Sequence, residues 1–346
     1  METVWYCLLA WMLATYVVLD GFDFGVGMLH LFVARNETER KQVIRSIGPL
    51  WDGNEVWLIA AGGTMFLAFP KLLAVSFSGF YLPLMIVLWL LIFRALGIEL
   101  RHHLEDRIWT EFWDVAFAGA SLLLAIFFGA AMGNVVRGVP LNAEGIFFEP
   151  LWTNFRVGQE TGILDWFTIL TGLTAVLALA HHGALWLSAR TDGEVEKRAD
   201  RFAAGLWPLV CVATVVTALI SVLVQPNVKE SLSARPWGIV FMGLAVLGLI
   251  GAYVLRRRRK VLQAFLASSA YLYGMFASAA IAIYPYVLPA RDPALGLTAQ
   301  AAATGRNALV VGLYWWIPGM LLACGYFIYL HSTMPAKFSV HDAPDE

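Results

Sequence analysis

Charged residues are scarce in this sequence. Asp, Glu, Lys and Arg make up only 14% of the 346 residues, whereas 59% are hydrophobic. A chain with so little charge does not have the composition of a soluble domain, and it predicts an all-α integral membrane protein. The formal net charge of −1 argues against a nucleic-acid partner, because such a partner requires a concentrated basic face.

Cysteines are few, and the common cofactor motifs are absent. The three cysteines lie singly in apolar segments, with no CxxC pair, disulfide framework or zinc spacing, and are interpreted as small buried residues (Cys7, Cys211 and Cys324). The chain has no HExxH, Walker loop, CxxCH or dinucleotide fingerprint. We therefore expect this chain to carry no redox centre and no metal site.

Nine hydrophobic runs are long enough to cross a bilayer, and they predict a single transmembrane domain over residues 1–346. The runs cover about residues 5–34, 49–70, 72–94, 112–133, 163–188, 202–225, 237–255, 261–285 and 307–331. We expect helices one to four and five to eight to form two four-helix bundles, with the ninth added. The N-terminus lacks the basic region and cleavage motif of a signal peptide, so we expect the first run to be retained.

The positive charges predict the orientation of these helices. Most of the 24 Lys and Arg residues fall on one side of the alternating runs, Arg94 and the cluster Arg256–Lys260 among them. Basic loops face the cytoplasm, so we expect the N-terminus outside and the C-terminus inside. The cluster is interpreted as a topology anchor, with a lipid head-group site as the alternative. The external connection 134–162 is interpreted as a solvated loop, with a lid or partner contact as alternatives.

Four acids fall within the first two hydrophobic runs. Asp20 and Asp23 lie in LDGFDFGVGM, and Asp52 and Glu55 lie in WDGNEVW, so each pair has i, i+3 spacing on one helical face. The apolar run after Glu55 is too short to span the membrane alone. A helix that begins near Pro49 would be long enough and would place the second pair inside the membrane.

Acids at this depth favour a role in proton transfer. Each intramembrane Asp costs on the order of 2.5 to 3.5 kcal/mol at mid-depth, and protonation relieves much of that cost, which suits such groups to accept and pass protons. Asp52 and Glu55 follow an inner loop, so protons from the cytoplasm would meet them first. If the first two helices pack antiparallel, the two pairs face each other, and glycines on both helices permit close approach (Gly21, Gly25, Gly27, Gly62 and Gly63). The alternative is that the acids cap helix ends or hydrogen-bond a neighbouring helix.

Only two of the seven histidines are expected to lie within the membrane, away from the ends of the predicted spans. His181 and His182 are adjacent, so they point about 100° apart on a helix and cannot both bind one metal from one face. We interpret them as polar contacts or interface residues, with a single haem ligand as the alternative. The others lie at helix ends, in an inner loop or, for His341, in the C-terminal tail.

Six ordered motifs of this chain resemble those of subunit II of cytochrome bd-type quinol oxidases. The match is dense over about the first 120 residues and looser afterwards, where IAIYPYVLP (281–289) and the helix count support it. Six motifs in order are far more specific than any one short pattern. They are DGFDFGVGML (20–29), RNETER (35–40), SIGPLWDGNEVWLIAAGG (46–63), FSGFY (77–81), FRALGIELR (93–101) and FWD (112–114).

The resemblance implies a nine-helix partner of a subunit I that carries haems b558, b595 and d and oxidises quinol. The complex reduces oxygen to water without pumping and takes its protons from the cytoplasm. The proton path proposed for the family matches Asp20, Asp23 and Asp52 here, whereas Glu55 is not carried over. The resemblance further implies the bacterial inner membrane, contact with lipid and quinol, and a structurally bound quinone, and it leaves open small single-helix accessory subunits.

Two other functions are compatible with the same residues. A proton-coupled secondary transporter would use intramembrane acids and glycine-rich helices, although nine helices without inverted repeats do not favour it. A purely structural scaffold would assemble the haem subunit and use the acids only as interface hydrogen bonds.

Overall fold

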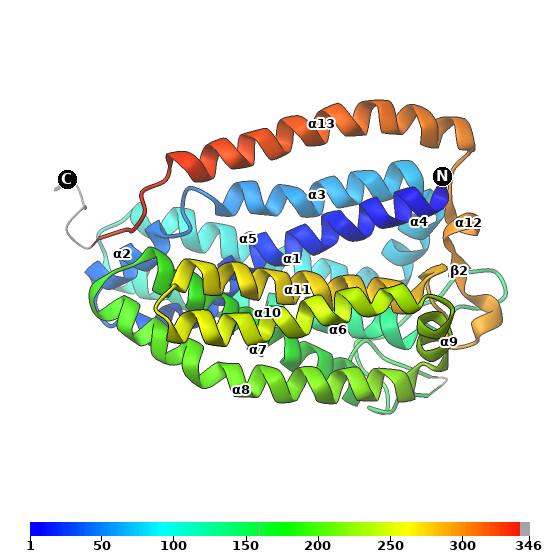
Figure 1. Ribbon diagram of the computed structural model, residues 1–346, viewed down its shortest axis with the longest axis horizontal. Coiled ribbons are helices and arrows are strands. Elements are labelled where there is room, and N and C mark those ends of the chain that lie inside the picture. The colour runs from blue at the N-terminus through cyan, green and yellow to red at the C-terminus, as the bar shows by residue number, and fades with distance from the viewer. Residues whose placement is uncertain (159, 340–346) are drawn as a thin grey trace.

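The protein is a sheaf of long helices that run roughly along one axis (Figure 1). The computed structural model describes residues 1–158 and 160–339, so His341 lies outside the described residues. The N-terminus and the end of the last helix, at Thr333, lie at opposite ends of the sheaf (Figure 1). The helices are α1 (Glu2–Val33), α2 (Glu37–Arg45), α3 (Trp51–Ala68), α4 (Pro70–Gly79), α5 (Tyr81–Glu99), α6 (Arg107–Arg137), α7 (Trp166–Arg190), α8 (Gly193–Val224), α9 (Pro226–Ala234), α10 (Ile239–Arg257), α11 (Val261–Ile283), α12 (Ala299–Ala302) and α13 (Arg306–Thr333).

Short elements complete the fold. Three 3-10 turns lie between the helices, η1 (Leu100–His102), η2 (Pro236–Gly238) and η3 (Pro293–Leu295). The strands β1 (Tyr286–Leu288) and β2 (Leu297–Thr298) form a small antiparallel pair after α11. The fold is therefore helical as predicted, apart from this short hairpin at one end of the sheaf.

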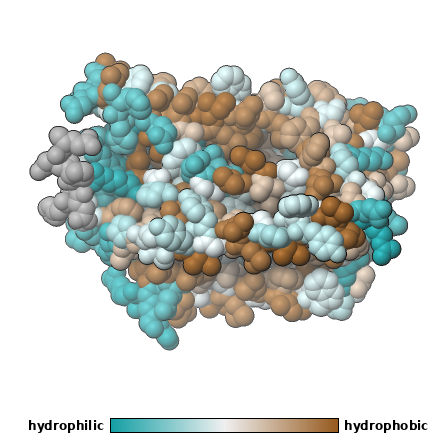
Figure 2. Space-filling model, turned by 90° about the horizontal axis from the view of Figure 1, so that it is seen from above, coloured by the Kyte–Doolittle hydropathy of each residue, from teal (hydrophilic) through white to brown (hydrophobic). Residues whose placement is uncertain are grey.

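The composition of the long helices fits a membrane. Eight helices of the described chain are long and apolar enough to cross a bilayer, and the bent pair of α3 and α4 brings the number to nine if it is counted as one span. Figure 2 shows apolar residues gathered along the middle of the molecule and polar residues at its two ends. The cysteines differ from the prediction, because Cys7 is exposed and the other two are half-buried (Cys211 and Cys324).

The predicted third span, residues 72–94, is wrong because the chain turns in the middle of it. Helix α3 ends at Ala68, α4 bends away from it by 119°, and α5 begins only at Tyr81. Pro83 explains the break, since a proline inside a continuous helix removes a hydrogen bond and clashes with the preceding turn. The predicted start near Pro49 lies within two residues of the observed one, because α3 begins at Trp51. Pro49 lies in a turn, and the 18 residues of α3 extend for about 27 Å.

Helix α1 lies at the centre of the sheaf. Its residues 20–30 are all buried, and it packs against α3, α6, α7 and α11. The backbone of α1 is closest to α7, where a Cβ atom on Gly25 would lie 2.1 Å from the carbonyl oxygen of Leu179. The prediction that glycines join the first two helices is wrong, because Cβ atoms on Gly62 and Gly63 would meet nothing within 4 Å. Close backbone approach therefore joins α1 to α7.

The connection between α6 and α7 is anchored by a buried arginine. Arg137 donates a 2.6 Å hydrogen bond to Glu149 and pairs with Asp165, the N-cap of α7. Burial raises the pKa of Glu149, and the charge of Arg137 opposes that rise. The ring of Phe147 fills the space beside Gly79. The interpretation as a solvated loop is therefore wrong for these residues, which hold the loop onto the helices.

Candidate functional site

A buried arginine on α5 joins acids from two other helices. Arg94 donates through Nη1 to Oδ1 of Asp20 on α1 and through Nη2 to Oε1 of Glu55 on α3, each at 2.5 Å. The side chains of Arg94 and Asp20 are fully buried, while Glu55 is 22% exposed. Hydrogen bonds between charged groups are the strong ones, and a buried charge without a partner is costly. This ion pair therefore ties α1, α3 and α5 together at one point.

Asp23 is paired with a neutral group instead. The side-chain amide of Asn54 donates to Oδ2 of Asp23 at 2.8 Å and to the carbonyl oxygen of Leu19 at 3.3 Å. Asn54 and Glu55 are neighbours on α3. Asn54 contacts Asp23 directly, whereas Glu55 is linked to Asp20 through Arg94. We call the five side chains the Arg94 cluster (Arg94, Asp20, Asp23, Asn54 and Glu55).

Several polar atoms of this region have no hydrogen-bond partner among the described residues. They are Tyr16 Oη, Asp20 Oδ2, Asp23 Oδ1, Asn54 Oδ1 and Arg94 Nε. Buried polar atoms are normally paired with protein or with ordered water. The cluster holds three carboxyl groups but only one cation, so full ionisation of all three would leave net negative charge in a medium of low dielectric constant. The cluster is thus chemically suited to bind water and to hold a proton that can exchange.

Asp52 lies apart from the cluster. It is exposed in the first turn of α3, and no hydrogen bond or ion pair of its side chain occurs within the described residues. The i, i+3 spacing places Asp52 one helical turn before Glu55, on the same side of α3. The structure therefore brings together three of the four acids singled out from the sequence, Asp20, Asp23 and Glu55, and leaves Asp52 at the surface near them.

Two residues of the cluster were missed from the sequence. Arg94 was counted among the basic residues at the inner ends of the spans, but it lies inside α5. Asn54 was passed over as part of a motif. The signal for Arg94 was its place in an apolar run, LLIFRALGI, because an isolated charge there needs a buried partner.

The two histidines of α7 are both buried. His182 is hydrogen-bonded through Nδ1 to Ser268 at 2.6 Å and through Nε2 to the carbonyl oxygen of Val18 at 3.1 Å. The imidazole also stacks on Phe265, with ring centroids 4.5 Å apart. Both nitrogens of His182 are therefore engaged with the protein, which fits a polar contact between helices α7, α11 and α1. His181 Nδ1 has no partner among the described residues.

A second polar cluster lies at the opposite end of α1 from the N-terminus. Asp114 of α6 accepts from Arg101 at 2.6 Å and from Arg40 at 2.9 Å, and His30 Nε2 lies 2.7 Å from it. Arg101 also donates to Glu37 at 2.7 Å. We call these side chains the Asp114 cluster. It clamps the ends of α1, α5 and α6 to the short helix α2.

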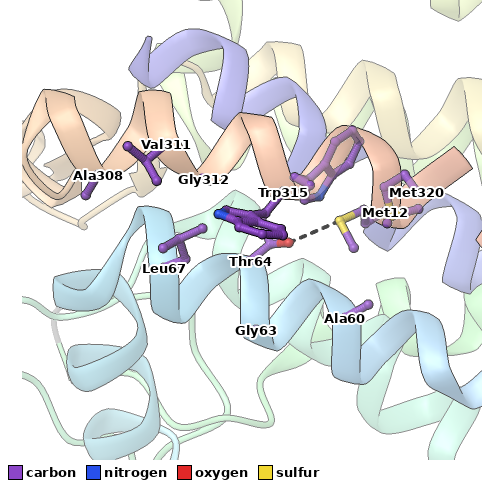
Figure 3. Close-up of a pocket in the computed structure, with 12 residues that line it drawn as sticks. Met12, Ala60, Gly63, Thr64, Leu67, Ala308, Val311, Gly312, Trp315 and Met320 are labelled. Carbon is purple, nitrogen blue, oxygen red and sulfur yellow. Dashed lines mark hydrogen bonds between the residues drawn. The ribbon is translucent and has the colours of Figure 1, made fainter. Parts of the chain in front are cut away.

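An apolar groove runs between α1, α3 and α13 (Figure 3). Its volume is about 610 Å³. Thr64 donates to the sulfur of Met12 at 3.3 Å across the groove, with Trp315 on its α13 side. Trp316 also lines the groove, and its buried indole N–H has no partner in the described chain. The groove therefore has apolar walls, and a buried indole N–H without a partner lies on one of its lining residues. Elsewhere in the described residues, no group of three or more His, Cys, Asp or Glu is arranged to hold a metal ion.

Comparison with known proteins gives the family. Residues 1–334 match the model of cytochrome bd terminal oxidase subunit II. This chain belongs to that family. It is 34% identical over 312 residues to cytochrome bd-I ubiquinol oxidase subunit 2 of Escherichia coli K12, covering 83% of this chain and 81% of the relative. It is 30% identical over 357 residues to the probable cytochrome oxidase subunit 2 of Haemophilus influenzae, and this match covers 96% of this chain and 93% of the relative.

The fold has a match among solved structures. The bd oxidase from Geobacillus thermodenitrificans contains a chain that superposes with a TM-score of 0.76 at 20% identity, covering 95% of this chain and 97% of that chain. Together with the eight apolar helices, these relatives show that this subunit II is a multi-pass protein of the bacterial inner membrane. The resemblance noted in its motifs is thus confirmed.

The motifs of this subunit II supply its two polar clusters. DGFDFGVGML and WDGNEVW provide the acids and the amide of the Arg94 cluster, and RNETER and FWD provide parts of the Asp114 cluster. FRALGIELR contributes to both, because Arg94 and Arg101 lie seven positions apart along the same segment. Residues that are scattered over five motifs in the sequence therefore form two compact sites.

Proposed function

We propose that this subunit II chain supports a haem-bearing subunit I in a quinol:oxygen oxidoreductase and delivers cytoplasmic protons for the reduction of oxygen to water. The Arg94 cluster carries the proposal, because it gathers three acids, a single cation and an amide inside an inner-membrane protein. The related protein of Escherichia coli is a subunit of a ubiquinol oxidase by name. Family membership favours this function over the transporter that the acids alone would allow.

The proposed route begins at Asp52. This exposed acid takes up a proton and passes it to Glu55, one turn further along α3. Glu55 and Asp20 share Arg94, so the proton then reaches the acids of α1 with Asp23 as the last carrier. The direction follows from the predicted orientation with the N-terminus outside and the C-terminus inside. This orientation requires the N-terminus and the end of α13 to lie at opposite ends of the sheaf, as they do (Figure 1). The proposal includes one transmembrane domain of two four-helix bundles and a ninth helix.

We place the redox centres in the partner. Haems b558, b595 and d belong to subunit I in this proposal, and His182 supports it because both of its ring nitrogens bind protein atoms. A reduced-minus-oxidised absorbance spectrum of this chain alone, and again with subunit I, tests the assignment. Haem bands should appear only with the partner. Haem bound by the lone chain would show that His181 or His182 is a ligand and that the division of labour is wrong.

The groove between α1, α3 and α13 fits a structurally bound quinone. An isoprenoid tail would lie along its apolar walls, and the free indole N–H of Trp316 would donate to a quinone oxygen. Trp316→Phe keeps the ring and removes this donor. We expect the variant complex to retain less quinone after purification in detergent, measured by extraction and chromatography, while its haem spectrum stays unchanged. Equal quinone content in both proteins would contradict the site.

The relay is tested at Asp52. Asp52→Asn removes the ionisable group, so oxygen consumption should fall by roughly a hundredfold, the lower end of the effect of a positioned proton-transfer group. Its haem content should stay near normal because Asp52 holds no other side chain. Glu105→Gln is the matched control, since Glu105 is also exposed and has no ion-pair partner among the described residues. Normal turnover in Asp52→Asn would refute its role as a relay.

The scaffold remains a second candidate because Arg94 ties three helices together. In that case Asp20→Asn would lower the yield of assembled complex, whereas each assembled complex would turn over at the normal rate. The relay predicts the opposite pattern. Measuring oxygen consumption per haem, together with haem per total protein, separates the two functions.

A further inference from the structure

The turn between α10 and α11 presents a run of exposed positive charge. Arg257, Arg258, Arg259 and Lys260 follow one another and are all exposed. The backbone N–H groups of Arg258, Arg259 and Lys260 bond back to the last turn of α10 at 3.1, 2.9 and 3.0 Å. Arg259 adopts φ +61° to close this turn. The tight backbone holds the four charges within one small surface.

Little negative charge balances this surface. Asp200 of α8 accepts from Arg256 at 2.9 Å and lies 3.8 Å from Arg259. No carboxylate of the described residues forms an ion pair with Arg257, Arg258 or Lys260. One acid therefore faces five cations, and the excess charge is available to an anion from outside the chain.

Aromatic rings fix the position of one of these cations. The guanidinium of Arg257 lies 5.3 Å from the ring centroid of Tyr253, which stacks on Trp207 of α8 with centroids 4.5 Å apart. Trp207 in turn donates to the carbonyl oxygen of Leu249 at 2.9 Å. Tryptophan and tyrosine concentrate where the membrane meets water, and an arginine over such a ring is held by a cation–π interaction. The stack therefore sets Arg257 at the depth of lipid head groups.

An apolar surface continues from this stack along the two helices. Five side chains of α8 and α10 are each at least 50% exposed (Leu209, Val212, Val246, Leu247 and Ile250). A cationic end joined to an exposed apolar face is complementary to an anionic amphiphile. We propose that the border of α8 and α10 binds the phosphate head group of an anionic phospholipid through Arg257 and Arg258, with the acyl chains along both helices. This site is independent of the proton relay.

The test uses the complete oxidase in nanodiscs that contain spin-labelled phosphatidylglycerol or spin-labelled phosphatidylcholine. The immobilised lipid fraction, measured by electron paramagnetic resonance, should be larger for phosphatidylglycerol. The double variant Arg257→Gln/Arg258→Gln should weaken that preference by about fivefold for each charge removed near the surface. It should not change the immobilised fraction of phosphatidylcholine, and oxygen consumption should stay at the wild-type rate.

The matched control removes the same charge elsewhere. Arg107 on α6 and Lys41 on α2 are exposed cations of other helices, so Arg107→Gln/Lys41→Gln should leave the preference intact. An equal loss in both double variants, or no preference in the wild-type protein, would overturn the site. Release of phosphatidylglycerol by millimolar inorganic phosphate would show that the surface recognises free phosphate and would overturn the lipid assignment.

Discussion

The amide of Asn54 donates a 2.8 Å hydrogen bond to Asp23. Asp20, almost one helical turn earlier on α1, is bound by the guanidinium of Arg94 at 2.5 Å. A cation stabilises a buried carboxylate far more strongly than an amide does. The two acids of one short motif are therefore unequal, and we expect Asp20 to be ionised while Asp23 holds a proton.

Asp23→Asn tests this inequality. The change keeps the shape of the side chain and removes its carboxyl group, so an infrared C=O stretch of a protonated carboxyl should disappear from the spectrum of the complex. Oxygen consumption should fall as well if Asp23 is a carrier. Asp20→Asn is the control, because an ionised Asp20 contributes no such band. Persistence of the band in Asp23→Asn would place the proton on another group.

Arg94→Gln should destabilise the complex severely. It leaves Asp20 and Glu55 without their cation, and removal of one partner from a buried ion pair costs about 3 to 5 kcal/mol. Arg94→Lys keeps the charge but cannot present two donors in a fixed fork, so an intermediate thermal stability is expected. Arg107→Gln, which removes an exposed arginine, should leave the melting temperature unchanged. A stable Arg94→Gln complex would show that the ion pair is not structural.

The Asp114 cluster should weaken in acid. Hydrogen bonds from Arg101 hold the pKa of Glu37 below its usual value, and burial opposes them. An acid whose pKa is lower in the folded state contributes stability above its unfolded pKa and loses that contribution as the pH falls through the folded pKa. Melting temperatures measured downward from about pH 4.5 should therefore fall less in Glu37→Gln than in the wild type. Glu105→Gln is the control and should follow the wild-type curve. If Glu37→Gln followed it as well, the Glu37 carboxylate would make no contribution to the loss of stability in acid.

The end of the molecule that holds Glu149 should respond to pH with the opposite sign. Burial raises the pKa of Glu149 in the folded state, so its contribution to stability is complete below its unfolded pKa and is lost as the pH rises through the folded pKa. Glu149→Gln resembles the protonated form. Hydrogen exchange of the loop between α6 and α7 should therefore depend less on pH in this variant. An unchanged pH dependence would mean that Arg137 compensates the buried charge fully.

Gly25→Ala should loosen the contact between α1 and α7. The added Cβ would lie 2.1 Å from the carbonyl oxygen of Leu179 and 2.7 Å from the Cα of Gly183, and such overpacking costs about 1 to 3 kcal/mol. A lower melting temperature of the complex is the expected result. Gly63→Ala adds the same atom to α3 where nothing lies within 4 Å, so it should be neutral. Equal stability of the two variants would contradict the packing.

The sequence identified Asp20 and Asp23 because an acid in an apolar run is conspicuous without any knowledge of its neighbours. Their partners depend on which helices pack together, and local periodicity does not contain that information. Arg94 was therefore counted as a basic residue at the end of a span, and Asn54 was not singled out at all. The spacing of Asp52 and Glu55 predicted one helical face, but only the packing of α3 shows that one lies at the surface and the other reaches Arg94.

The helices themselves were largely predictable from length and hydrophobicity. Eight of the nine predicted runs each agree with one observed helix to within about ten residues at either end. The failure is the run 72–94, which begins within α4 and ends within α5. Pro83 and Gly79 were visible as breakers, but the apolar residues on both sides of them outweighed these signals in a simple count of hydrophobicity. Local backbone chemistry, not hydrophobicity, determines where this part of the chain turns.

The distance along the chain between Asp20 and its cation has a consequence for biosynthesis. Arg94 follows Asp20 by 74 positions, so the ribosome completes α1 well before α5 exists. During that interval Asp20 would meet lipid without a counter-charge, which opposes release of α1 alone into the bilayer. We therefore expect the insertion machinery to retain α1 until α3 and α5 emerge, and to release the three helices together as one unit.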